Sequence, residues 1–194
     1  MSLLNQPAPT FTLTTLQGGR ISLADYSGRS NVLLWFSRGF QCPFCRAHIG
    51  LFSQAYQSLC DNQTEVIQVA PNLLESARLF FRAESPPFPF VCDPDKYLYA
   101  RYGLGDRGVL EATRNTFVAF STAAVKGEFA ETVRGSWLDV MNRNFIRRLH
   151  HHALTAIEQG LFLIDKEGVV RHQIIVKPLD PLPDFAELQK LIAS

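Results

Sequence analysis

The two cysteines of the motif Cys42-Pro43-Phe44-Cys45 constrain this chain more than any other feature. The motif follows an apolar run, Asn31 to Phe36, and opens a stretch from Pro43 to about Cys60 whose apolar residues recur at helical spacing. The first run predicts a buried strand, and the second predicts a helix in which Pro43 takes the first position. The sequence therefore places two thiols where a strand ends and a helix begins.

This position favours redox chemistry at the two sulfurs. The first turn of a helix presents unpaired backbone N–H groups and the positive end of the helix dipole, and both favour a thiolate over a thiol. A spacing of two residues lets the second sulfur reach the first, so that a disulfide can form with little backbone movement. We expect Cys42 to be the more exposed, attacking sulfur and Cys45 to be the shielded sulfur that resolves the mixed disulfide.

A C-x-x-C pair can also be half of a zinc site, a structural disulfide or a pair of inert thiols. Cys60 and Cys92 do not form a second such pair, and the clustered histidines, 150–152, lie far along the chain. Those histidines fall in a helical pattern, where consecutive side chains point in different directions, and are expected to be a solvated face or a docking site. We therefore predict no metal and no organic cofactor. Cys60 and Cys92 are expected to be buried structural cysteines, with a further resolving role as the alternative for Cys92.

Composition sets wider limits on the protein. The 194 residues, 46% hydrophobic and 19% charged, can build one globular domain with a substantial core. A formal net charge of +1 gives no reason to expect nucleic acid or an anionic membrane as a partner. No apolar run approaches the roughly 18 residues of a spanning helix, and the first residues lack the pattern of a signal peptide. A cytoplasmic location is therefore expected, where thiols stay reduced.

Strand and helix signals alternate along the chain. A hairpin is predicted over 11–23, around the turn 17–20, and a second hairpin joins strands over 161–164 and 169–175. Between them, further strands are predicted over 65–70 and 88–91, and helices over 74–82, 95–102, 110–125 and 137–157, with a last helix over 185–193. This order predicts an α/β fold with a central mixed sheet flanked by helices.

The order of elements, with a dithiol at the first main strand–helix junction, resembles the thioredoxin fold. More closely it resembles the peroxiredoxin branch, the alkyl hydroperoxide reductase/thiol-specific antioxidant (AhpC/TSA) family, in the stretches 7–13, 88–94 and 160–171. The likeness is greatest to the peroxiredoxin-like subgroup that carries a C-x-x-C and a helical insertion. The resemblance implies a single thioredoxin-like domain over 1–194, with the helical insertion at about 104–159.

Departures from the family pattern bear on the mechanism. Peroxiredoxins carry the peroxide-attacking cysteine in a P-x-x-x-T-x-x-C motif; here Cys45 falls on that cysteine, Cys42 on the Thr and Arg38 on the Pro. The family's peroxide-holding arginine corresponds to Gln159, which also matches the cis-proline site of thioredoxins. The pair Pro43-Phe44 resembles the Pro-Tyr of glutaredoxin motifs. The resemblance thus implies a dithiol on a peroxiredoxin-like frame.

Three hypotheses follow. The favoured one is a thiol–disulfide oxidoreductase and antioxidant protein that cycles Cys42 and Cys45 and is reduced by thioredoxin or glutathione, with Arg38 either stabilising the Cys42 thiolate or solvated in its loop. The second is a thiol-dependent peroxidase that forms a sulfenic acid on Cys45 or Cys42 and reduces hydrogen peroxide, organic hydroperoxides or lipid endoperoxides. The third is a non-catalytic binding or redox-sensing module that uses the insertion. The insertion could also supply a lid or the surface of a homodimer.

Overall fold

The computed structural model describes residues 2–40, 42–105 and 157–176, together with positions 183, 187 and 190. Contacts divide the chain into two compact units, Met1–Gly105 with Glu158–Ser194, and Asp106–Ile157. Apart from Ile157, the described residues belong to the first unit. The helices predicted over 110–125, 137–157 and 185–193 lie outside the described residues, and the single domain with an insertion stays a prediction.

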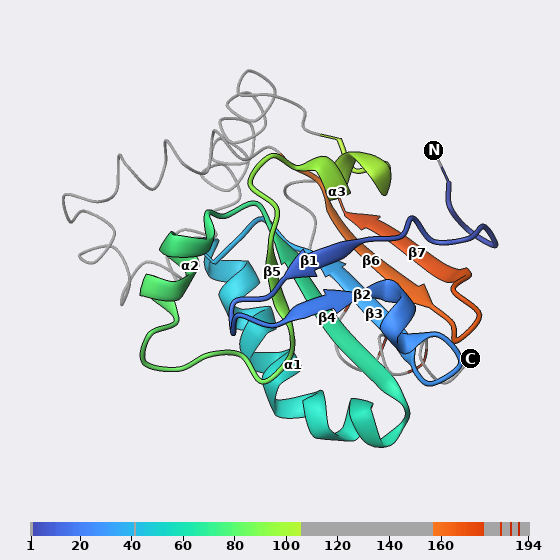
Figure 1. The fold of residues 1–194 in the computed structure, drawn as a ribbon, viewed down its shortest axis with the longest axis horizontal. Coiled ribbons are helices and arrows are strands. Elements are labelled where there is room, and N and C mark those ends of the chain that lie inside the picture. The colour runs from blue at the N-terminus through green and yellow to red at the C-terminus, as the bar shows by residue number, and fades with distance from the viewer. Residues whose placement is uncertain are drawn as a thin grey trace, which may run out of the picture. The chain divides into compact units, whose positions relative to one another are not determined.

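A five-stranded mixed sheet organises the first unit, with the strand order β5-β4-β3-β6-β7 (Figure 1). The central strand β3 runs parallel to β4 and antiparallel to β6, so the predicted mixed sheet is confirmed. It is central because five of its six residues are apolar and buried, as expected for a strand covered on both faces. The strands are β3 Asn31–Phe36, β4 Thr64–Ala70, β5 Phe90–Cys92, β6 Gln159–Ile164 and β7 Val170–Val176.

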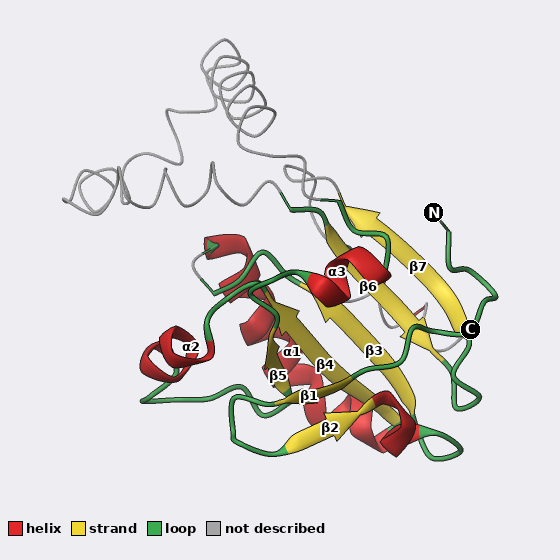
Figure 2. Ribbon diagram, turned by 45° about the horizontal axis from the view of Figure 1, so that its top comes forward, coloured by secondary structure: helices red, strands yellow, loops and turns green. Residues whose placement is uncertain are grey.

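Helices and a small hairpin cover the sheet. Figure 2 shows the long helix α1 on one face, and the hairpin of β1 and β2 with the short helix α3 on the other. None of the helices in the described part of the chain is long and apolar enough to cross a bilayer. The remaining elements are β1 Thr12–Thr14, β2 Arg20–Ser22, the 3-10 turn η1 Leu23–Tyr26, and the helices α1 Pro43–Asp61, α2 Leu74–Phe80 and α3 Tyr97–Arg101.

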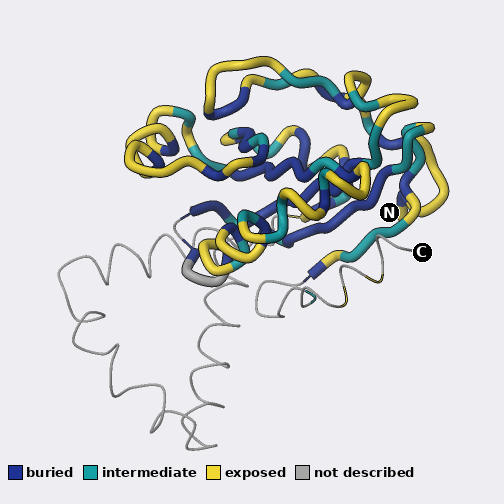
Figure 3. Tube along the Cα trace, turned by 90° about the horizontal axis from the view of Figure 1, so that it is seen from below, coloured by how far each residue is buried: buried dark blue, intermediate teal, exposed yellow. Residues whose placement is uncertain are grey.

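Aromatic side chains fill the core on both faces of the sheet, and Figure 3 shows the strands as the buried centre of this unit. On the α1 face, the Trp35 ring packs against Phe52, with ring centroids 5.1 Å apart. On the other face, Phe36 contacts the rings of Tyr99 and Phe162, at 5.0 and 5.6 Å. Alternation along β3 therefore directs neighbouring residues into two separate layers.

The loop after β3 fixes how the chain enters α1. Gly39 has a φ of +90°, and a Cβ atom at this position would lie 2.4 Å from Oδ1 of Asn72. The same Asn72 oxygen accepts a hydrogen bond from the backbone N–H of Phe40, at 3.3 Å. Only glycine combines this backbone conformation with such a close approach. The loop is thereby held against the segment that follows β4.

Candidate functional site: a buried dithiol

The amino end of α1 presents the predicted cysteine pair. Cys42 is the N-cap residue, Pro43 takes the first helical position, and Phe44 and Cys45 complete the first turn. The backbone carbonyl of Cys42 accepts the first helical hydrogen bond from the N–H of Arg46, at 3.0 Å, but the Cys42 side chain makes no capping bond. The sulfur of Cys42 is therefore not used to cap the helix.

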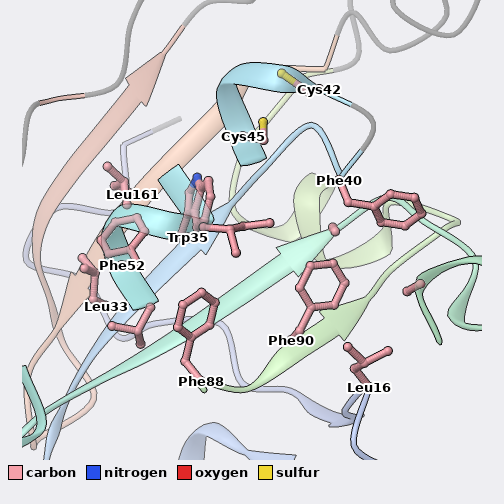
Figure 4. Close-up of a cluster of buried hydrophobic side chains, with 14 of the residues drawn as sticks. Leu16, Leu33, Trp35, Phe40, Cys42, Cys45, Phe52, Phe88, Phe90 and Leu161 are labelled. Atoms are coloured by element: carbon pink, nitrogen blue, oxygen red, sulfur yellow. The ribbon is translucent and has the colours of Figure 1, made fainter. Parts of the chain in front are cut away.

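Both sulfurs are buried, which corrects one expectation. Cys42 is 2% exposed and Cys45 is 0% exposed, so Cys42 is only marginally the more exposed residue and does not present its sulfur to solvent as expected. The reason is that the first turn of α1 lies against the sheet, where both cysteines join an apolar cluster with Phe40, Ile49 and Trp35 (Figure 4). Both are free thiols in this structure.

The two thiols interact strongly. The pKa of Cys45 is raised well above its ordinary value, first because the Cys42 side chain is hydrogen-bonded to it, then because of burial and because of charge on Cys42. A thiolate was expected to be favoured at the start of the helix, but at Cys45 the thiol is favoured instead. Two groups coupled in this way lose their protons one after the other. Removing the proton of Cys45 is therefore least favourable when Cys42 already carries a negative charge.

Gln159 lies directly against Cys45. Because β6 is antiparallel to β3, the amino end of β6 meets the carboxyl end of β3, where Phe36 pairs with Gly160. The Cys45 thiol donates a hydrogen bond to Oε1 of Gln159, with an Sγ–O distance of 3.3 Å, and Gln159 is 2% exposed. An acceptor facing the thiol favours its protonated form. Gln159 therefore favours the protonated thiol of Cys45, whereas an arginine at this position would favour the thiolate.

Arg38 is half-buried in the loop after β3. Its backbone N–H and its guanidinium charge both lower the pKa of Cys45, against the larger effects that raise it. The structure thus places the positive charge close enough to the dithiol to act on Cys45. Stabilisation of the Cys42 thiolate by Arg38 stays a prediction.

A layer of buried polar groups beneath the dithiol was not predicted from the sequence. Nε2 of Gln68 donates to Oγ of Ser37 at 2.9 Å, and the Ser37 hydroxyl donates to the carbonyl of Val69 at 3.3 Å. The buried Tyr99 hydroxyl is directed at the carbonyls of Ser37 and Val69. The signal in the sequence was Gln68 itself, a polar residue within an otherwise apolar strand centre. These bonds fix the loop that carries Arg38 and leads to Cys42.

The other cysteines lie in less reactive surroundings. Cys92 is half-buried at the carboxyl end of β5, on the sheet edge predicted for it, and burial raises its pKa to about 11 although the Arg78 charge opposes this. Cys60 is half-buried in the last turn of α1, and its pKa is also raised, chiefly by burial. Across the described ranges, no three His, Cys, Asp or Glu side chains are grouped as metal ligands would be.

Comparison with known proteins identifies the family. The model of the AhpC/TSA family matches residues 4–126. A Mycobacterium tuberculosis protein named as a peroxiredoxin is 30% identical over 117 residues, which cover 57% of this chain and 74% of the relative. A Coxiella burnetii protein, also named as a peroxiredoxin, is 27% identical over 167 residues, covering 86% of this chain and 84% of the relative.

Solved structures agree on the fold. The chain resembles the reduced 2-Cys peroxiredoxin of Plasmodium vivax with a TM-score of 0.66 and 13% identity, covering 100% of this chain and 81% of that one. It resembles the peroxidoxin BcpB of Mycobacterium tuberculosis with a TM-score of 0.64 and 13% identity, covering 100% and 96%. The α/β thioredoxin-like fold is confirmed, while the C-x-x-C subgroup stays a prediction. The chain belongs to the AhpC/TSA family of the thioredoxin-fold superfamily and is a thiol-dependent oxidoreductase.

Proposed function

We propose that this enzyme is a thiol–disulfide oxidoreductase and antioxidant protein that cycles Cys42 and Cys45 between dithiol and disulfide. The observation that carries the proposal is the pair of free thiols at the first turn of α1, where the hydrogen bond to Cys42 and charge on Cys42 raise the pKa of Cys45. The Cys42 thiolate attacks a substrate disulfide, and the departing thiolate takes up a proton. Cys45 then loses its proton and attacks the mixed disulfide, which releases the second substrate thiol.

The residues around the pair have supporting roles in this proposal. Arg38 lowers the free energy of a thiolate at the dithiol through its charge and its backbone N–H. Pro43 and Phe44 set the spacing that lets the two sulfurs meet. Gln159 holds the thiol proton of Cys45 until the resolving step. Two electrons leave the dithiol in each cycle, and thioredoxin or glutathione returns them.

A second candidate, peroxide reduction, is favoured by the burial of both sulfurs. A small peroxide reaches a sulfur that is 0–2% exposed more readily than a protein disulfide does. In this candidate Cys45, at the family's peroxidatic position, attacks the peroxide and becomes a sulfenic acid, which Cys42 resolves. Burial favours hydrogen peroxide over organic hydroperoxides and lipid endoperoxides. Peroxiredoxin relatives support the same candidate.

One pair of assays distinguishes the two candidates. Stopped-flow oxidation of the reduced protein by hydrogen peroxide is measured beside disulfide reduction with the same stock. Fast peroxide oxidation that gives a Cys42–Cys45 disulfide supports peroxide reduction. Slow peroxide oxidation with ready disulfide reduction supports the disulfide oxidoreductase. If the protein performs neither reaction, a binding or redox-sensing module remains.

Single substitutions then assign the roles. Cys42→Ser should abolish disulfide reduction, and Cys45→Ser should trap mixed disulfides with the substrate. For peroxide reduction, Cys42→Ser should still consume one equivalent of peroxide and Cys45→Ser should consume none. Cys60→Ser is the matched control, because it removes a thiol from the same helix far from the pair. Continued disulfide reduction by Cys42→Ser would show that the role assignment is wrong.

We further propose a cytoplasmic location, where the thiols stay reduced, and a homodimer as the working assembly. Light scattering at two protein concentrations tests the dimer. Reduction of the oxidised enzyme by a thioredoxin system, compared with glutathione alone, identifies the reductant.

A further inference from the structure

Two fully buried polar side chains lie next to each other on the α1 face of the sheet. Nε1 of Trp35 and Oε1 of Gln68 have no hydrogen-bond partner within the described ranges, and both residues are 0% exposed. Trp35 and Gln68 are paired in the register of β3 and β4, so their side chains leave the same face on adjacent strands. Buried polar groups are almost always hydrogen-bonded, because leaving them unpaired is unfavourable. Two such atoms on paired residues of one sheet face are candidates for binding a small molecule.

Both groups are fixed in position by their neighbours. The other end of the Gln68 amide donates to Oγ of Ser37, which also accepts from the backbone N–H of Gly39 at 3.2 Å. The Trp35 ring packs between Phe52 and His48, with centroid distances of 5.1 and 6.1 Å. The result is one fixed N–H donor and one fixed carbonyl acceptor. A hydroxyl group both accepts and donates, so it has the chemistry to bind both groups.

The Trp35 member of this pair lies in the same buried cluster as the dithiol. Trp35 and Cys45 belong to one buried cluster, and Figure 4 shows the indole nitrogen at the edge of the Trp35 ring nearer to Cys45. Cys45 is also the sulfur that points at the sheet, where it meets Gln159. A phenylalanine at position 35 would make the same ring contacts without adding a buried N–H. The buried indole N–H is therefore available to donate to a bound molecule.

We propose that the Trp35 N–H and the Gln68 carbonyl bind a small hydroxyl-bearing molecule next to Cys45. An oxygen of the molecule accepts from Trp35, and its O–H donates to Gln68. Water and hydrogen peroxide share this chemistry, and a buried water commonly joins otherwise unpaired polar groups. The catalytic ligand in this proposal is hydrogen peroxide, which displaces water from the site.

The proposal rests on the peroxide-reducing candidate and specifies where its substrate binds. The Cys45 sulfur gives up its proton and forms an S–O bond with the bound peroxide, the O–O bond breaks, and the departing oxygen takes up that proton and leaves as water. Cys42 then attacks the sulfenic sulfur, and the second oxygen leaves as water. The two thiols supply two protons and two electrons, and the product is the Cys42–Cys45 disulfide.

Two substitutions test the site. Trp35→Phe keeps the ring but removes the N–H, and Gln68→Met keeps the length but removes the amide oxygen. Each should slow oxidation of the dithiol by hydrogen peroxide about tenfold, since each removes one hydrogen bond to the substrate. Oxidation by a small disulfide, which has no hydroxyl group, should change by less than about twofold. Gln57→Met, at an exposed position of α1, is the matched control and should leave both rates unchanged.

Two results would overturn the proposal. An unchanged peroxide rate in both variants would mean that the pair binds water only. Equal slowing with both oxidants would mean that the residues position the dithiol and not the peroxide.

A second measurement avoids the risk that the Trp35 and Gln68 variants fail to fold. In the Cys42→Ser/Cys45→Ser protein, hydrogen peroxide should shift the indole N–H resonance of Trp35 in a saturable way, and Trp137→Phe identifies that resonance by elimination. No shift would contradict the proposal. A shift in a protein whose native form does not consume peroxide would leave the site intact and refute the proposed reaction instead.

Discussion

The two ends of α1 place cysteines in opposite surroundings. At the amino end, Arg38 and the helix dipole favour negative charge, and the raised pKa of Cys45 comes first from its partner Cys42. At the carboxyl end, Cys60 has no such partner; burial and the charges of Glu65 and Asp61 raise its pKa, and only the hydrogen bond with Tyr56 opposes them. A raised pKa thus has different meanings at the two ends. In the pair the first cause is the hydrogen bond to the neighbouring thiol, whereas at Cys60 the causes are burial and nearby carboxylates.

Of the substitutions considered, replacement of Gln159 should change the reactivity of the dithiol at the amino end of α1 most. Gln159→Arg puts a positive charge where an amide oxygen now accepts the Cys45 thiol proton. We expect the pKa of Cys45 to fall and oxidation by hydrogen peroxide to accelerate on the order of 100-fold. Stopped-flow rates at several pH values measure both effects, because a lower pKa moves the rise of the rate with pH to lower pH.

The isosteric variant Gln159→Glu is the control for this prediction. A carboxylate at the same place should raise the pKa of Cys45 further and slow the reaction. Slowing by both variants would show that packing around this buried position, and not charge, governs the dithiol. Cys60 should keep its alkylation rate in both variants, since it lies at the other end of α1.

Much of this arrangement could be predicted from local sequence. The strand Asn31–Phe36 and the start of α1 at Pro43 have the predicted bounds, because an apolar run and an N-terminal proline are strong local signals. The position of Gln159 opposite Cys45 followed only from the family resemblance. The structure starts β6 at Gln159 rather than at Leu161, since pairing with β7 extends the strand beyond its apolar run.

What the sequence could not predict depends on contacts between distant segments. The burial of Cys42 follows from how α1 lies on the sheet, and no local pattern records that angle. The approach of Asn72 to Gly39 joins two loops that are adjacent only because β3 and β4 run parallel. Trp35 and Gln68, which carry the unpaired atoms, are neighbours only because of the register between β3 and β4.

Glycine at position 39 should matter more than glycine at position 18, although their backbones are alike. Gly39 and Gly18 have φ values of +90° and +92°, but only Gly39 has an atom, Oδ1 of Asn72, in the way of a Cβ. Gly39→Ala should lower the free energy of unfolding by about 2 kcal/mol or more, and Gly18→Ala by about 1 kcal/mol. Urea unfolding measures both.

The same two variants test how far the amino end of α1 depends on this loop. Gly39→Ala should also slow disulfide reduction, because Arg38 and Cys42 lie on either side of the altered residue. Gly18→Ala should leave the reaction unchanged. Equal losses of stability with normal activity in both would mean that the Asn72 contact does not position the dithiol.

Removing the charge of Arg38 should lower the reactivity of the dithiol at the amino end of α1 by a smaller factor. In Arg38→Ala the backbone N–H remains and only the guanidinium is lost, so part of the effect on Cys45 persists. We expect the pKa of Cys45 to rise and the rate of dithiol oxidation to fall about tenfold at neutral pH. Arg38→Lys keeps the charge and should retain most of the rate. A rate in Arg38→Ala equal to that of the unmodified protein would mean that solvent screens this charge.

The smallest effect is expected at the carboxyl end of α1. Oε1 of Glu65 accepts hydrogen bonds from the Tyr56 hydroxyl at 2.8 Å and from the Val66 N–H at 3.0 Å, and a glutamine can keep both. Glu65→Gln therefore removes mainly a negative charge near Cys60. Because the raised pKa of Cys60 means that its thiolate forms only at higher pH, removing the charge should shift alkylation of Cys60 toward lower pH.

That shift should be small, about a twofold gain in alkylation rate at pH 8, because burial is the larger cause of the raised pKa and is unchanged. Mass spectrometry of the peptide that contains Cys60 measures the rate against pH. Asp61→Asn, which removes the other nearby charge, should act in the same direction and more weakly. A shift toward higher pH in Glu65→Gln would mean that the bond between Tyr56 and the Cys60 sulfur, and not the carboxylate charge, controls this thiol. The two ends of α1 would then differ in hydrogen bonding rather than in charge.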